Sequence, residues 1–175
     1  TLANPDWKDL NLALNIVAKC GVTPWVLPES IPDADFFVGL SYTQGRDNAQ
    51  EKYLGYANVF NQFGRWEFYT GSGETFPYTE RAVHFERLVR STLERLAKQH
   101  SLQPSPNLAF HYSAKLSRED RSAILAGARA IRPNGRYTFV WLNSHHITRF
   151  YDQKPESDGS LQRGGYVITG PGQLY

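Results

Sequence analysis

Hydrophobic and polar residues follow helical spacing in three segments of the chain. Between positions 6 and 20, apolar residues recur every three or four positions, which predicts an amphipathic helix that Gly21 ends. From about residue 78 to residue 100, a second apolar face predicts the longest helix, with most basic residues lying off that face. Ser117, with Asp120 three residues later, resembles a capping box and predicts a third helix that reaches about Ile131. The apolar positions of the second helix are Phe85, Leu88, Val89, Leu93 and Leu96.

Segments rich in aromatic and β-branched residues predict the strands. The first three follow one another with short polar connections, among them the segment 43–50, so we expect an antiparallel meander. One strand then precedes the third helix and one follows it, after a turn at Pro133-Asn134-Gly135. The expected strands are 35–42, 53–63, 66–70, 107–113 and 137–142, with two further short strands at 147–151 and 166–169.

The order of these elements after the first helix is β-β-β-α-β-α-β. Right-handed crossovers would turn this order into a mixed sheet covered by helices. This is an α/β architecture with the element order of the ribonuclease H-like fold.

Composition narrows the class of protein. The chain has 175 residues, of which 41% are hydrophobic, enough for one ordinary core. The formal charge of +2 is too small to indicate a polyanionic partner by itself. Cys20 has no second cysteine to pair with, and we expect it to be a small buried residue in a reducing compartment. No apolar stretch is long enough to span a bilayer, so we expect a cytoplasmic protein, and the absence of Met indicates a processed chain or a fragment.

The positions where a ribonuclease H-like nuclease needs carboxylates hold mostly neutral residues. Such enzymes place acids in the first strand and at the end of the fourth, because divalent metal ions must be held beside the scissile phosphate. Ser41 and Ser113 stand at these places, and a hydroxyl supplies no anionic charge. Glu74 is the nearest suitable acid, although by itself it is more typical of a solvated loop glutamate than of a catalytic residue. We therefore expect no metal site.

Basic residues offer candidates for phosphate contacts. Lys19 lies in the last turn of the first helix, where a lysine also simply favours the helix C-terminus. His145, His146 and Arg149 lie beside a strand edge and could donate hydrogen bonds to several phosphate oxygens. A further basic cluster at the end of the third helix has solvent exposure as its ordinary explanation; its members are Arg129, Arg132 and Arg136.

Two segments give the sequence its resemblance to the Argonaute and Piwi family, of the prokaryotic type. Leu10–Gly21, followed by Pro24-Trp25, is similar to the family's junction between the MID and PIWI domains. Tyr137–Phe150 is similar to its strand followed by His-His-Thr-Arg. The resemblance implies a MID-like edge at 1–29 and a PIWI domain, of ribonuclease H-like fold, at 30–175 that is truncated at its C-terminus.

The resemblance also implies roles for the candidate residues. Lys19 matches a lysine that helps hold the guide's 5′-phosphate, while a second basic position of some members is Asn15 here. His145, His146 and Arg149 match contacts to the guide backbone. No cofactor is implied for catalysis, which leaves Mg²⁺ at the guide 5′-phosphate as the one ion the family pattern allows.

The family's slicing tetrad is degenerate in this sequence. Ser41 and Ser113 fall on two aspartates, and Glu74 in Gly73-Glu-Thr-Phe-Pro77 matches the mobile glutamate. We therefore expect a PIWI module that binds a single-stranded RNA or DNA guide and its complementary target without cutting, completed by a partner polypeptide or by further segments. A metal-dependent, guide-directed endonuclease and a protein-interaction scaffold of the same fold are the alternatives.

Overall fold

The computed structural model describes residues 7–23, 26–47, 50–100, 102–113, 115–142, 168–171 and 173–174. The chain divides into two compact units, Thr1–Asn143 and Ser144–Tyr175. In the second unit, β7 (Ile168–Gly170) and β8 (Gln173–Leu174) form an antiparallel pair. The first unit contains α1 (Trp7–Lys19), β1 (Phe36–Asp47), β2 (Gln50–Asn61), β3 (Trp66–Gly71), β4 (Phe76–Pro77), the 3-10 helix η1 (Tyr78–Glu80), α2 (Arg81–Gln99), β5 (Asn107–Tyr112), α3 (Arg118–Ile131) and β6 (Arg136–Trp141).

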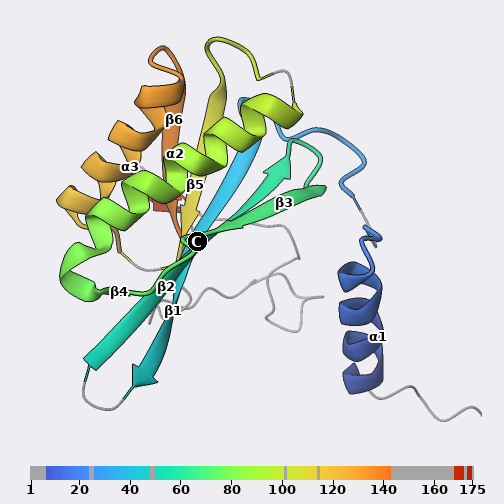
Figure 1. Ribbon diagram of the computed structural model, residues 1–175. Coiled ribbons are helices and arrows are strands. Elements are labelled where there is room, and N and C mark those ends of the chain that lie inside the picture. Colours follow the sequence, from blue (N-terminus) through green and yellow to red (C-terminus); the bar gives the residue numbers. More distant parts are fainter. Residues whose placement is uncertain are drawn as a thin grey trace, which may run out of the picture. The chain divides into compact units, whose positions relative to one another are not determined.

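The strands of the first unit form one mixed sheet in the order β3-β2-β1-β5-β6, with β4 paired to β2 (Figure 1). The pairs β1/β2 and β2/β3 are antiparallel, whereas β1/β5 and β5/β6 are parallel. The predicted meander and the predicted order β-β-β-α-β-α-β are both confirmed. The parallel half of the sheet therefore consists of β1, β5 and β6; α2 precedes β5, and α3 connects β5 to β6.

The core lies between the sheet and two helices on the same face of it, α2 and α3 (Figure 1). The predicted apolar stripe of α2 is buried: four of its residues are 0% exposed and Leu88 is 2% exposed. Val38 and Leu40 of β1 point into this core, as do Leu108 and Phe110 of β5. Because side chains alternate along a strand, the residues between them lie on the face away from the helices.

The helices α2 and α3 approach each other closely at Gly127. A Cβ atom on this glycine would lie 2.4 Å from the backbone oxygen of Glu86, a distance that real Cβ atoms do not reach. Gly127 is fully surrounded, since its neighbours Ile124 and Ala128 are 0% exposed and belong to the core. Only glycine permits this spacing of the two helices.

Three features differ from the expectations or extend them. β1 continues to Asp47 and β2 begins at Gln50, so most of the polar connection expected at 43–50 is a strand hairpin. Cys20 is exposed rather than buried, because it follows α1, in which Leu10 and Ile16 are also 44% and 54% exposed. The strand expected at 147–151 lies outside the described residues, and β7 begins two residues later than the strand expected at 166.

Among the residues described, no helix is long and apolar enough to cross a bilayer.

Replacement of Gly127 by alanine should destabilise the fold. The added methyl group must push α2 and α3 apart, and such overpacking costs about 1–3 kcal/mol of unfolding free energy, occasionally more. Urea denaturation followed by tryptophan fluorescence measures this loss. Ser122→Ala is the control on the exposed side of α3 and should change stability by less than about 0.5 kcal/mol. An alanine variant as stable as the original chain would show that the helices are not in tight contact.

Candidate functional site

Ser41 and Ser113 occupy neighbouring positions at the carboxyl end of the parallel strands. The last aligned pair of β1 and β5 is Leu40 with Tyr112. Ser41 is the next residue of β1, and Ser113 directly follows β5. Ser41 is half-buried and Ser113 is exposed. The register thus brings together the two serines that sequence analysis singled out.

Glu74 lies in the loop between β3 and β4 and makes its side-chain contacts with α2. Its carboxylate oxygen Oε1 lies 3.6 Å from the Arg87 guanidinium and 4.0 Å from His84 Nδ1. The Ser72 hydroxyl donates a 2.8 Å hydrogen bond to the backbone oxygen of Glu74, which holds the loop. The Glu74 side chain is 63% exposed, so water screens its ion pair with Arg87. In the described part of the chain, the ion pairs of this carboxylate go to the helix and not toward Ser41.

These positions do not fit a pair of divalent metal ions. Each ion needs several oxygen ligands with enough negative charge to replace its water shell. Two of the three positions carry neutral hydroxyls, and the third is a carboxylate paired with Arg87. Within residues 7–142 as far as they are described, and in β7 and β8, no group of three or more His, Cys, Asp or Glu could hold a metal ion.

Of the candidates for phosphate binding, only Lys19 belongs to the described residues. Lys19 is the last residue of α1, and Gly21, with φ of 81°, follows it in the left-handed conformation that ends helices. The backbone N–H of Cys20 still donates to the Ile16 carbonyl at 2.9 Å, so the helical turn before Lys19 is complete. His145, His146 and Arg149 lie outside the described residues.

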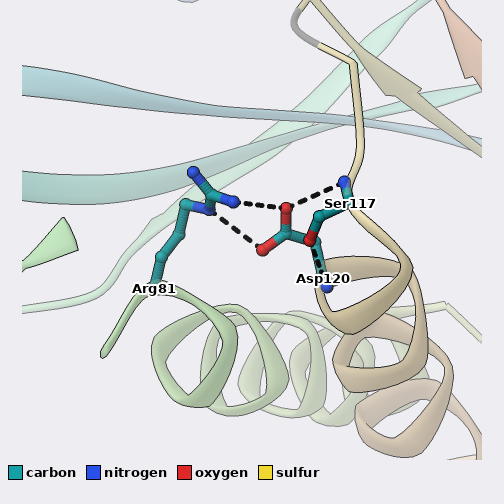
Figure 2. A network of polar contacts seen from close by, with 3 residues as sticks. All are labelled: Arg81, Ser117 and Asp120. Atoms are coloured by element: carbon teal, nitrogen blue, oxygen red, sulfur yellow. Dashed lines mark hydrogen bonds and ion pairs between the residues drawn. The ribbon is translucent and has the colours of Figure 1, made fainter. Parts of the chain in front are cut away.

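A buried ionic network joins the first turns of α2 and α3, and sequence analysis found only half of it (Figure 2). The predicted capping box is present, with Ser117 and Asp120 bonded to each other's backbone N–H. In addition, Arg81 donates to both carboxylate oxygens of Asp120, from Nε at 2.9 Å and from NH2 at 2.6 Å. The signal available in the sequence was an arginine at the start of one helix and an acid in the cap of another, but nothing indicated that these two ends meet.

The network fixes charge beside the carboxyl ends of the strands. The side chains of Arg81 and Asp120 are 13% and 3% exposed. Burial opposes ionisation, but hydrogen bonds from Arg81 and Ser117 hold the pKa of the Asp120 carboxyl below its ordinary value. Burial raises the pKa of Tyr112, the last residue of β5, and the tyrosine therefore stays neutral. At the end of β5, Tyr112 is thus neutral, and Asp120 of α3 is a carboxylate paired with Arg81.

Comparison with solved structures shows which known fold this arrangement matches. The Argonaute of A. aeolicus matches over 79% of this chain with 19% sequence identity and a TM-score of 0.57. A structure of Aa-Ago with externally bound siRNA matches over 79% with 18% identity and a TM-score of 0.56. The chain has a ribonuclease H-like fold.

This ribonuclease H-like chain spans 19% of the length of either Argonaute chain that it matches. No protein family model and no curated protein sequence matches it. The similarity at these levels of identity is one of fold, so the chemistry of the site rests on the residues of this chain.

Carboxylates at the two serine positions should create a weak metal site in this ribonuclease H-like protein. We expect Ser41→Asp/Ser113→Asp to bind Mn²⁺ with a dissociation constant on the order of 10⁻⁴–10⁻³ M, the range of weak oxygen-ligand sites. Electron paramagnetic resonance of free Mn²⁺ measures the binding. The control Ser41→Asn/Ser113→Asn has similar volume without charge and should not bind. If the aspartate variant binds no more Mn²⁺ than the control, the two positions are not adjacent.

Loss of the Asp120 carboxylate should destabilise the protein in a pH-dependent manner. Asp120→Asn leaves Arg81 buried without its counter-charge, which costs about 3 kcal/mol at pH 7. Since the pKa of Asp120 is lowered in the folded state, its contribution is present above the ordinary carboxyl pKa and is lost as the pH falls through the lowered value. The stability gap between wild type and variant should therefore narrow below about pH 4. Urea denaturation at several pH values tests this, with the exposed Glu119→Gln as control; a gap independent of pH would contradict it.

Proposed function

We propose that this chain is a guide nucleic-acid-binding module of the Argonaute type whose nuclease site is inactive. The observation that carries the proposal is the register of β1 and β5, which puts neutral Ser41 beside neutral Ser113 where a nuclease of this fold needs carboxylates. Two-metal cleavage requires those anions to hold the ions that stabilise the attacking and leaving oxygens. With hydroxyls in both places, the site keeps the fold of a nuclease without its metal-binding charge.

Binding rather than cutting is the role that the remaining residues support. One of the matching Argonaute structures holds an externally bound siRNA. In this chain, Lys19 is the last residue of α1, and it matches the lysine that, by the resemblance, helps hold the guide's 5′-phosphate. Phosphate contacts of this kind position a strand without reading its sequence, and the guide's own bases would then select the target.

The proposed pocket for the guide strand needs further residues, further polypeptide and a Mg²⁺ ion. His145, His146 and Arg149 hold the guide backbone in it, and further polypeptide, in the same chain or in a partner, completes the 5′-phosphate pocket. A Mg²⁺ ion at that phosphate is part of the proposed pocket, and omission of Mg²⁺ should weaken binding of phosphorylated strands only.

Binding of short strands with a 5′-phosphate or a 5′-hydroxyl tests the module directly. We expect fluorescence anisotropy to show tighter binding of the phosphorylated strand, and Lys19→Ala to reduce its affinity about tenfold or more, the effect of one lost hydrogen bond to a charged group. Lys8→Ala is the matched control, because it removes the same charge from the other end of α1. Affinity should fall steeply between 50 and 200 mM salt.

The same incubations, analysed for products, separate this proposal from catalysis. No strand should be cleaved in the presence of Mg²⁺. Cleavage that Glu74→Ala abolishes would instead establish an active nuclease. Equal binding of both strands by all variants would mean that the chain has no working 5′-phosphate site.

A further inference from the structure

Positive charge is concentrated in the helical half of the first unit. The formal charge of the whole chain is only +2, yet residues 81–136 contain 11 of its 19 basic residues and 4 of its 17 acidic residues. The rest of the chain is consequently acidic. A small net charge thus conceals a strongly basic segment that builds α2, α3 and the start of β6.

Most of the arginines of α2 already have partners. Arg81 is paired with buried Asp120, and Arg90 lies 2.7 Å from Glu86. Arg87 lies 3.6 Å from Glu74, and the Arg95 guanidinium stacks over the Phe68 ring with its carbon 4.5 Å from the centroid. Three of these four arginines are thus ion-paired with acids, which reduces the unpaired charge on α2.

The cations of α3 are arranged differently. Arg118, Arg121 and Arg129 follow one another at intervals of three and eight residues, which places them along one side of the helix. All three are exposed, as is Lys115 just before the helix. Within the described residues, none of the four forms an ion pair with an acid. We call these four residues the α3 basic stripe.

The neighbouring strand fixes where this stripe runs. The Arg121 guanidinium carbon lies 5.7 Å from the ring centroid of Phe139 in β6, the last described strand on that side of the sheet. Tyr137 of β6 donates to the backbone oxygens of Ala128 and Arg132, which holds the end of α3 against the strand. Arg132 is only partly exposed and donates to the carbonyls of Gln103 and Leu102, so it is not counted in the stripe. The stripe therefore lies on a rigid helix at one edge of the sheet.

We propose that the α3 basic stripe binds the phosphate backbone of a nucleic-acid duplex. Eleven helical residues separate Arg118 from Arg129, a rise of about 16 Å. A strand of B-form duplex advances 3.4 Å per nucleotide, so the stripe matches roughly five nucleotides of one strand. The exposed guanidinium groups, free of acidic partners among the described residues, supply the charge complementarity. The stripe contains none of Lys19, Ser41 and Ser113, and its contacts need neither a 5′-phosphate nor a base sequence.

Removal of the stripe should reduce the salt dependence of duplex binding. The probe is a 20-base-pair duplex with 5′-hydroxyl ends, measured by fluorescence anisotropy between 50 and 200 mM KCl. We expect Arg118→Gln/Arg121→Gln/Arg129→Gln to lower the slope of log K against log salt by about two to three, roughly one for each lost phosphate contact. Glutamine keeps helix propensity close to that of arginine, and each single variant should lower the slope by about one.

A charge-matched control separates the stripe from net charge. Arg65→Gln/Arg90→Gln/Lys98→Gln removes the same three charges from other elements and should lower the slope by less than about one. Equal effects of the two triple variants, or no effect of either, would overturn the proposal. If the triple variant of the stripe no longer sediments with phosphatidylserine vesicles but binds the duplex as the original chain does, the stripe binds an anionic membrane. This result would also overturn the proposal.

The outcome is distinguishable from that of the guide-binding experiment. If Lys19→Ala removes the preference for a 5′-phosphate and the stripe variant has no effect, the guide proposal stands and the stripe proposal fails. If no 5′-phosphate preference exists and the stripe variant still loses duplex affinity, the reverse holds.

Discussion

Burial of the apolar stripe of α2 against the sheet is the interaction on which the rest of the structure depends. This helix connects the antiparallel meander β1-β2-β3 to the parallel strand β5, so its packing direction decides on which side of β1 the chain continues. Phe85, Val89 and Leu93 are fully buried, and residues from β1, β2 and β5 complete the same core. Once α2 is in place, Gly127 allows α3 to pack closely beside it, and β6 can extend the sheet.

The same packing determines the chemistry of the carboxyl edge. Arg87 on α2 attracts Glu74, and Arg81 at the start of α2 binds Asp120, so both carboxylates are paired with arginines on this helix. Ser41 and Ser113 keep the adjoining strand ends neutral. Two aspartates at these positions would repel each other unless a cation neutralised them. The edge can therefore form without a metal ion, and its stability does not depend on catalytic ligands.

Much of the fold was predictable because its long elements have strong local patterns. The buried face of α2 and the capping box of α3 are encoded by residues within a few positions of one another, and both predictions are confirmed. The extension of β1 to Asp47 was missed because its polar residues, such as Thr43 and Gln44, show no buried alternation; pairing with β2 extends it. The exposure of Cys20 and the meeting of Arg81 with Asp120 depend on tertiary contacts, or on their absence, which no local pattern encodes.

The candidate site shows the same division between local and tertiary information. The neutral residues at positions 41 and 113 can be read from the sequence, but their adjacency depends on the parallel register that ends at Leu40 and Tyr112. The electrostatic surface likewise depends on tertiary structure. The net value of +2 was too small to indicate a polyanionic partner by itself. Among the described residues, however, the structure separates the paired arginines of α2 from those along α3 that form no ion pair with an acid. Since an electrostatic surface is made by the charges that remain after ion pairing, the fold determines it and the composition does not.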